Sequence, residues 1–235
     1  MRLQLFSNST NAGEEYLSYT LPYIDDFLPK GERAAVFIPF AGISVGFDKY
    51  TDMVSERMGT LGITLSSLHT SGNKKKTLEE AEIIITGGGN TFHLLHILQQ
   101  EKLLETVRER VMKGIPYIGW SAGSNLACPT IKTTNDMPVV ETDGFKALDL
   151  IPFQINPHYT DFRQEDHAGE TREMRIEEFL LVNRKLVVVG LREHSLLQIE
   201  EKKIDLKGKR SCRIFRYGNA PVEIRPGEDL SFLLQ

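Results

Sequence analysis

A serine between two glycines, in the pattern G-x-S-x-G, is the clearest candidate for a reactive residue in this sequence. The motif is Gly119-Trp120-Ser121-Ala122-Gly123, directly after the apolar residues 116–118. Such a pentapeptide forms a tight turn from a strand into a helix and exposes the serine hydroxyl at the carboxyl end of the strand. The free N–H groups of a helix that begins near Ala122 would point to where an oxyanion forms. Ser121 is therefore the candidate nucleophile.

A second glycine-rich turn, Gly87-Gly88-Gly89-Asn90, lies between the strand-like residues 82–86 and the helix-like residues 91–99. Glycines leave backbone N–H groups accessible, which suits a phosphate or the negative charge of a tetrahedral intermediate. A phosphate site is disfavoured, because neither a P-loop ending nor the full G-x-G-x-x-G spacing is present. Two junctions of this kind predict parallel strands that end side by side.

A serine nucleophile needs a base within hydrogen-bonding reach, and His158 is the best candidate. It follows a short apolar run in Ile155-Asn156-Pro157-His158, where the proline fixes the approach to a strand-end cleft. The other histidines fit structural roles. We expect His93 and His96 to lie on a helix face or in the core. We expect the other three to lie on the surface, namely His69, His167 and His194.

Two carboxylates compete to orient the base, and the residues alone do not rank them. Asp136 lies in a turn-like segment before Met137-Pro138, whereas Glu193 follows the predicted strand at 186–191. Arg172, at a predicted helix start, could form a bidentate clamp on a substrate carboxylate.

The elements that must position these residues alternate between short β-branched runs and longer amphipathic runs. The pattern predicts strands at 3–6, 34–39, 64–68, 82–86 and 116–118, and helices at 14–28, 47–61, 91–99 and 103–112. Residues 129–169 are predicted to be mostly loop, followed by a helix at 171–181, a strand at 186–191 and antiparallel hairpins to the C-terminus. We therefore expect one α/β domain over residues 1–235, with a mostly parallel sheet sandwiched by helices.

Composition limits the functional classes. The 235 residues are 40% hydrophobic and 26% charged, with a net charge of −4, which is typical of a soluble globular protein and not of a nucleic-acid binder. The one short basic run, residues 74–76, is expected to be a solvated loop. Cys128 and Cys212 have no metal-ligand spacing and are expected to be core thiols. No segment resembles a signal peptide or a membrane span, so we expect a cytoplasmic protein without a cofactor or metal.

Several blocks together resemble the peptidase E family, the alpha-aspartyl dipeptidases. The resemblance runs in order from near the N-terminus to about residue 193, and it fades beyond about residue 195. Its blocks are Ser7-Asn8-Ser9-Thr10, residues 37–42, Gly87-Gly88-Gly89-Asn90-Thr91-Phe92, Gly119-Trp120-Ser121-Ala122-Gly123, residues 133–138, Ile155-Asn156-Pro157-His158 and Gly169-Glu170-Thr171-Arg172.

The resemblance implies a fold similar to class I glutamine amidotransferases and metal-free serine peptidase cleavage of dipeptides that begin with aspartate. It implies Ser121 as nucleophile, His158 as base and Glu193 as acid, with Asp136 as the alternative acid. It also implies an oxyanion hole from Gly88, Gly89 and Ala122, a carboxylate contact from Arg172 and a positioning role for Asn90. The sequence departs from the family at Ser124, where alanine is usual, and around residues 192–194.

Two other functions fit parts of the pattern. An esterase or amidase of the α/β-hydrolase type shares G-x-S-x-G but runs serine, acid, histidine along the chain, an order that Asp136 would give and Glu193 would not. A non-catalytic protein could instead bind an acidic metabolite through Arg172 and the glycine turn, and it would not need Ser121. For the peptidase we expect a small Asp-Xaa peptide as the partner and a monomer or homodimer.

Overall fold

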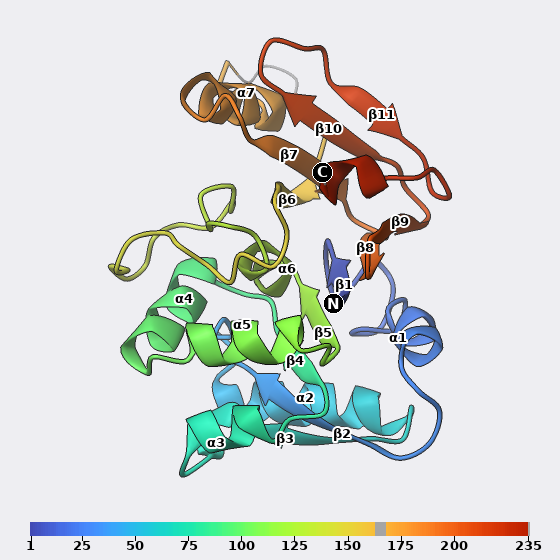
Figure 1. The fold of residues 1–235 in the computed structure, drawn as a ribbon, viewed down its shortest axis with the longest axis vertical. Coiled ribbons are helices and arrows are strands. Elements are labelled where there is room, and N and C mark those ends of the chain that lie inside the picture. Colours follow the sequence, from blue (N-terminus) through green and yellow to red (C-terminus); the bar gives the residue numbers. More distant parts are fainter. Residues whose placement is uncertain (163–167, 235) are drawn as a thin grey trace.

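Two β-sheets organise the chain in this computed structural model, which describes residues 1–162 and 168–234 (Figure 1). The larger sheet has seven strands in the order β3-β2-β4-β5-β1-β8-β9. Its first five strands are parallel, and β8 and β9 extend it as an antiparallel hairpin. The strands are β1 (Arg2–Phe6), β2 (Arg33–Ile38), β3 (Ile63–Ser67), β4 (Ile84–Thr86), β5 (Tyr117–Trp120), β8 (Ser195–Glu200) and β9 (Lys203–Gly208).

The smaller sheet has four strands in the order β11-β10-β7-β6. They are β6 (Gln154–Tyr159), β7 (Val187–Arg192), β10 (Cys212–Arg216) and β11 (Val222–Ile224), of which β6 and β7 are parallel. Helix α7 (Arg172–Val182) packs on this sheet through Ile176 and Leu180, which form their own apolar cluster with Val188 and Phe215. The chain passes from the small sheet to the large one between β7 and β8, at residues 193 and 194.

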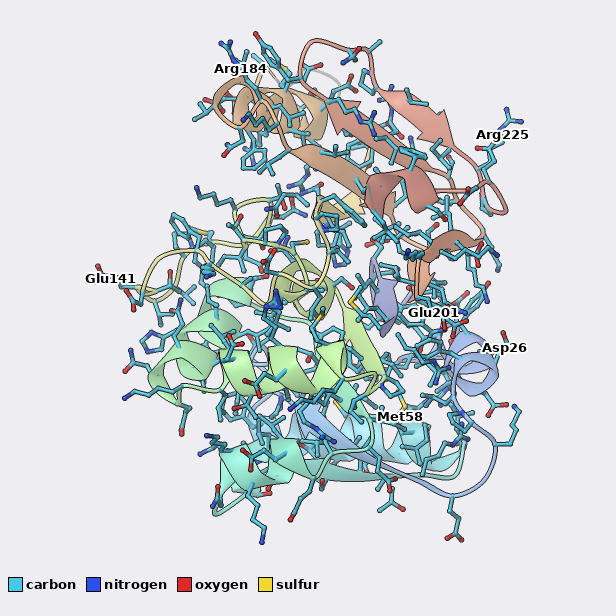
Figure 2. The ribbon with its side chains drawn as sticks, in the orientation of Figure 1. Asp26, Met58, Glu141, Arg184, Glu201 and Arg225 are labelled. Carbon is cyan, nitrogen blue, oxygen red and sulfur yellow. The ribbon has the colours of Figure 1, made fainter. Side chains whose placement is uncertain are left out.

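Helices cover both faces of the large sheet, as the sequence predicted. One apolar cluster joins the sheet to α1 (Leu21–Phe27) and α2 (Phe47–Gly59). A second joins its other face to α3 (Lys74–Glu79), α4 (Thr91–Gln100), α5 (Leu104–Met112) and α6 (Ala122–Leu126). Two short 3₁₀ turns, η1 (Leu68–Thr70) and η2 (Ser231–Leu234), complete the elements. Charged side chains such as Arg184, Glu201 and Arg225 project from the surface (Figure 2).

Three local expectations were wrong. The helix expected over residues 14–28 is only α1, because Pro22 occupies a first-turn position, which proline favours, and turns precede it. The basic run is not a loop but lies in α3, where Asn73 caps the helix and Lys75 and Lys76 lie near the glutamates four residues later, at 3.9 and 3.7 Å. Residues 129–169 contain the buried strand β6.

The turn after β5 brings helix α6 unusually close to the sheet. A Cβ on Gly123 would lie 2.2 Å from the carbonyl oxygen of Thr86, and one on Gly119 would lie 2.6 Å from the carbonyl oxygen of Gly123. These contacts are with backbone, which cannot move aside as a side chain can. Glycine at both positions is therefore what allows Ser121 to lie at the carboxyl ends of β4 and β5.

Gly123→Ala should lower the free energy of unfolding by about 1–3 kcal/mol, because the added methyl group forces α6 away from β4. Urea unfolding followed by circular dichroism measures this change. Gly59→Ala is the matched control, since it lies at the exposed end of α2 with nothing within 4 Å of its added Cβ. Equal stability of the Gly123→Ala variant and the wild type would show that α6 is not held at this distance.

Candidate active site

Ser121 lies on a strained turn between β5 and α6. Its φ is 53° and its ψ is −110°, a conformation that non-glycine residues rarely adopt. Its N–H donates to the carbonyl of Phe6 at 3.1 Å. Ser124 is fully buried, and its Oγ lies 2.6 Å from the same carbonyl and 2.9 Å from that of Gly119. The hydroxyl of Ser124 thus ties the turn to β1 and β5.

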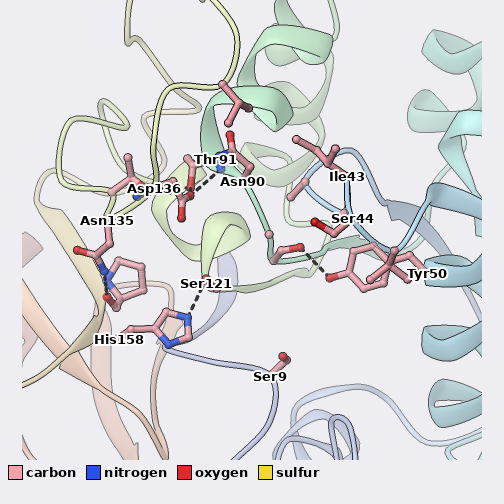
Figure 3. Close-up of a pocket in the computed structure, with 18 of the residues that line it drawn as sticks. Ser9, Ile43, Ser44, Tyr50, Asn90, Thr91, Ser121, Asn135, Asp136 and His158 are labelled. Atoms are coloured by element: carbon pink, nitrogen blue, oxygen red, sulfur yellow. Dashed lines mark hydrogen bonds between the residues drawn. The ribbon is translucent and has the colours of Figure 1, made fainter.

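His158 and Glu193 reach Ser121 from the smaller sheet. The Nε2 of His158 lies 2.9 Å from Ser121 Oγ (Figure 3). Its Nδ1 lies 2.7 Å from Glu193 Oε1. His158 has a φ of 54° at an irregularity in β6, where the register with β7 shifts between Asn156 and Tyr159. This bulge re-aims the imidazole towards the large sheet. Both side chains of the His158–Glu193 pair are partly exposed.

Ser7, directly after β1, holds the histidine and the strand that leads to the glutamate. Its buried Oγ accepts the backbone N–H of His158 at 2.8 Å and donates to the carbonyl of Leu191 on β7 at 2.7 Å. Sequence reasoning assigned Ser7 no role. Its place after a strand that lies beside the G-x-S-x-G strand is the signal that could have found it.

Asn8 fixes the turn that carries Glu193. Its Oδ1 accepts the N–H of His194 at 3.1 Å, and its Nδ2 donates to Asn11 Oδ1 at 2.7 Å. The hydroxyl of Tyr19 lies 2.7 Å from the same Asn8 Oδ1. Asn8 is 1% exposed, so a rigid polar group supports the turn between β7 and β8.

The glycine turn after β4 lies against the serine. A Cβ on Gly88 would come within 3.0 Å of Ser121 Cβ. The hydroxyl of Tyr50 donates to the Gly88 carbonyl at 3.0 Å (Figure 3). The same hydroxyl accepts the indole N–H of Trp120 at 3.0 Å. In a trans peptide the N–H of Gly89 points away from the Gly88 carbonyl, so Tyr50 sets the direction of that donor. Gly89 itself has a φ of 132° and abuts the backbone of Ala41.

Asp136 lies apart from the histidine. Its Oδ2 accepts the backbone N–H of Thr91 at 2.7 Å, and it lies 2.5 Å from Thr91 Oγ1 and 3.0 Å from Thr134 Oγ1. The partner of His158 Nδ1 is Glu193. The structure therefore places Asp136 at the start of α4 and brings Glu193, not Asp136, within hydrogen-bonding distance of His158.

Asn90 caps α4. Its Oδ1 accepts the N–H of His93 at 3.0 Å, and its Nδ2 donates to the carbonyl of Met137 at 2.9 Å. It also lines the cavity beside Ser121.

Arg172 lies at the first turn of α7 and hydrogen-bonds through Nη1 to the side-chain oxygen of Asn135. Burial and the nearby charge of Arg175 lower the pKa of Arg172 below its usual value. Within residues 1–162 and 168–234, no carboxylate forms a salt bridge with it. The half-buried guanidinium is held by a neutral amide, which leaves its charge available to a ligand.

Two adjoining cavities surround these residues. The larger, of about 720 Å³, is lined by Ser121, His158, Gly88 and Gly89. The smaller, of about 180 Å³, is lined by Arg172. Residues 134–136 line both cavities, so this segment is shared between them.

The remaining expectations concern histidines, cysteines, metals and membranes. His93 contacts the Phe40 carbonyl through Nδ1 at 2.6 Å, and His69 is half-buried between Ser67 and Asp48 rather than on the surface. His167 lies outside the described residues. Both cysteines are buried and free. Over the part of the chain that the structure describes, no group of His, Cys, Asp or Glu side chains is suited to a metal, and no helix is long and apolar enough to cross a membrane.

A serine that is hydrogen-bonded to a histidine, which is in turn bonded to a carboxylate, at the carboxyl edge of a mostly parallel sheet, defines a serine hydrolase. Comparison with known families is more specific. Residues 3–207 match the model of peptidase family S51, and the chain belongs to this family. It is therefore an enzyme, a serine peptidase.

Relatives of known name match nearly the whole chain. "Peptidase E" of Nostoc sp. is 46% identical over 234 residues, which cover 100% of this chain and 97% of the relative. "Peptidase E" of Salmonella typhimurium is 48% identical over 227 residues, which cover 97% of this chain and 99% of the relative. These matches do not favour the esterase or the non-catalytic binder.

Solved structures agree on the fold. A peptidase from an acI-B1 Actinobacterium has a TM-score of 0.71 at 16% identity, and covers 98% of this chain and 96% of its own. A protein of Listeria monocytogenes EGD-e, described as a candidate peptidase E, has a TM-score of 0.66 at 22% identity, and covers 88% of this chain and 98% of its own. The expected fold, similar to class I glutamine amidotransferases, is confirmed.

Glu193→Gln should lower kcat by about 10²–10⁴-fold, because the neutral amide no longer favours the imidazolium or fixes the required tautomer of His158. Steady-state kinetics on any cleaved peptide measures this change, with a thermal melt to verify folding. Glu201→Gln, which neutralises an exposed glutamate in the turn between β8 and β9, should keep the wild-type kcat. A Glu193→Gln enzyme with nearly wild-type kcat would exclude Glu193 as the group that orients the base.

Proposed function

We propose that this serine dipeptidase cleaves dipeptides whose first residue is aspartate, through an acyl-enzyme on Ser121. The observation that carries the chemistry is the continuous hydrogen-bonded series Ser121, His158 and Glu193. The observation that supports the aspartyl preference is the half-buried Arg172. It lines the 180 Å³ cavity, which shares residues 134–136 with the cavity of Ser121.

In this mechanism the Nδ1–H of His158 donates to Glu193, and Nε2 accepts the Ser121 proton as Oγ attacks the peptide carbonyl. The tetrahedral intermediate then collapses, the C–N bond breaks, and Nε2 returns the proton to the leaving amine. Water, deprotonated by His158, attacks the ester and releases aspartate. As the bond between the acyl carbon and Ser121 Oγ breaks, His158 gives the proton taken from water to Oγ, which restores the Ser121 hydroxyl.

The oxyanion hole is assigned to backbone N–H groups. The N–H of Ala122 lies at the start of α6, immediately after the nucleophile, where the helix has no internal acceptor for it. The close approach of Gly88 to Ser121, and the peptide orientation that Tyr50 sets, favour a second donor from the Gly88–Gly89 turn. Such donors stabilise charge that exists only in the transition state.

Arg172 would pair with the side-chain carboxylate of the substrate, and Asn90, which lines the larger cavity, would help to position the peptide. Discrimination against asparagine or leucine follows from charge. A neutral side chain would leave the half-buried guanidinium without a counter-ion, which costs more than the loss of one ordinary contact.

We treat residues 1–235 as one domain, because the proposed catalytic series takes members from both sheets and neither sheet holds it alone. A cytoplasmic location and a monomeric or homodimeric state stay predictions from the sequence. Gel filtration coupled to light scattering measures the oligomeric state.

Purified enzyme should cleave Asp-Leu in the presence of EDTA, and it should leave Asn-Leu and Leu-Leu nearly untouched. Ser121→Ala should reduce Asp-Leu cleavage by at least about 10⁴-fold, because the nucleophile is lost. Chromatographic detection of free leucine follows all three peptides with one readout. Comparable cleavage of Leu-Leu, or persistence of activity in the alanine variant, would contradict the proposed function.

Arg172→Gln should lower kcat/KM for Asp-Leu by about 100-fold or more, since a buried charge pair with the substrate is lost. Arg184→Gln is a matched control, because Arg184 is exposed just beyond the end of α7 and lines neither cavity. It should keep the wild-type kcat/KM. Similar losses in both variants would indicate a general electrostatic effect and not a direct carboxylate contact.

A further inference from the structure

Within the described residues, one oxygen of the Asp136 carboxylate is hydrogen-bonded and the other is not. Oδ2 lies within 3.0 Å of three donors, the N–H and hydroxyl of Thr91 and the hydroxyl of Thr134. For Oδ1, the described residues provide no hydrogen-bond partner. Asp136 lines the same cavity as Ser121, and Figure 3 shows its side chain in the space between Asn90 and Ser121. A fixed acceptor therefore faces the place where substrate must bind.

The charge of this acceptor defines its ligand. Among the described residues that line the 720 Å³ cavity, the acidic and basic side chains are those of Asp136 and His158. His158 is already hydrogen-bonded on both ring nitrogens, to Ser121 and Glu193. Asp136 is thus the one carboxylate in the described lining of this cavity, and a primary ammonium is the cation that a peptide substrate offers.

The position of Asp136 fits an N-terminal aspartyl residue. Such a residue carries its ammonium and its side-chain carboxylate on neighbouring carbons, so the two groups that receive them must also be neighbours. Asp136 and Arg172 both line the 180 Å³ cavity, and Asn135 lies beside Asp136 in the chain and hydrogen-bonds Arg172. The lining of this cavity therefore includes an anionic and a cationic group, which match the two charged groups of an N-terminal aspartyl residue.

We propose that Asp136 Oδ1 binds the free α-ammonium of the substrate's first residue, so that the enzyme accepts aspartate only at an N-terminus. This inference rests on the proposed aspartyl specificity and extends it from the side chain to the amino group. Thr91 and Thr134 hold the carboxylate in place through Oδ2, so binding requires no rearrangement of Asp136.

The test compares Asp-Leu with succinyl-leucine, which differs only by lacking the α-amino group. Wild-type enzyme should prefer Asp-Leu in kcat/KM by about 100-fold. Asp136→Asn should lose most of its activity on Asp-Leu through a higher KM and keep the wild-type rate on succinyl-leucine, so that the preference collapses. Its amide oxygen can still accept the Thr91 hydrogen bonds. Asp149→Asn, which neutralises an exposed carboxylate 3.7 Å from Arg108, should keep the preference.

Thr91→Val separates binding from helix capping. It removes the hydroxyl contact to Asp136 Oδ2 but keeps the carboxylate, so the preference for Asp-Leu over succinyl-leucine should persist. A preference that disappears equally in Thr91→Val and Asp136→Asn would overturn the inference in favour of a structural role. The rate at which a small alkyl fluorophosphonate labels Ser121 should stay at the wild-type value in Asp136→Asn, because this reagent has no ammonium.

The outcomes distinguish this inference from the proposed function. Wild-type cleavage of Asp-Leu and succinyl-leucine at equal rates would overturn the ammonium contact and leave the aspartyl specificity in place. Cleavage of neither compound, with Ser121 still labelled by the fluorophosphonate, would overturn both. Slow labelling in Asp136→Asn would show that Asp136 acts on the nucleophile, which contradicts a binding role.

Discussion

The hydrogen bond between Ser121 Oγ and His158 Nε2 joins two separate sheets, and the site depends on keeping them in register. The serine belongs to the seven-stranded sheet, whereas the histidine and glutamate come from β6 and the end of β7. Contacts between the two sheets hold this distance. Ser7 makes one of them, because its buried hydroxyl at the end of β1 bonds the backbone of both β6 and β7. The chain itself adds a second link where it crosses from β7 to β8.

Hydrogen bonds to one short segment hold the strained backbone at this junction in place. Ser121 and His158 both have positive φ, at 53° and 54°, and each such residue costs about 1–3 kcal/mol. Backbone N–H groups at both positions are hydrogen-bonded to the same short segment, that of Ser121 to Phe6 and that of His158 to Ser7. The end of β1 therefore holds the two strained residues against each other, and the chain cannot relax one without losing a buried hydrogen bond.

The sequence predicted the features that depend on residues close together in the chain. The alternation of strand and helix patterns gave the parallel sheet and its helices, and the glycine spacing gave Ser121. His158 could be selected from six histidines because a proline and an apolar run mark its approach. The ranking of Glu193 over Asp136 could not be derived, since it depends on how β7 pairs with β6. Tyr50 and Ser7 were missed for the same reason: their hydroxyls bond groups 38 and 151 residues away in sequence.

Neutral partners explain how the cavity can hold opposite charges before a substrate arrives. Asn135 orients Arg172, and hydroxyls with one N–H orient Asp136, so neither group is recorded in a salt bridge within the described residues. A direct ion pair between them would have to break when a zwitterionic aspartyl residue binds, and its energy would be subtracted from affinity. Amide and hydroxyl partners fix geometry without neutralising charge. Burial disfavours the charged form of Arg172 and lowers its pKa, and a substrate carboxylate would offset that cost by pairing with the guanidinium.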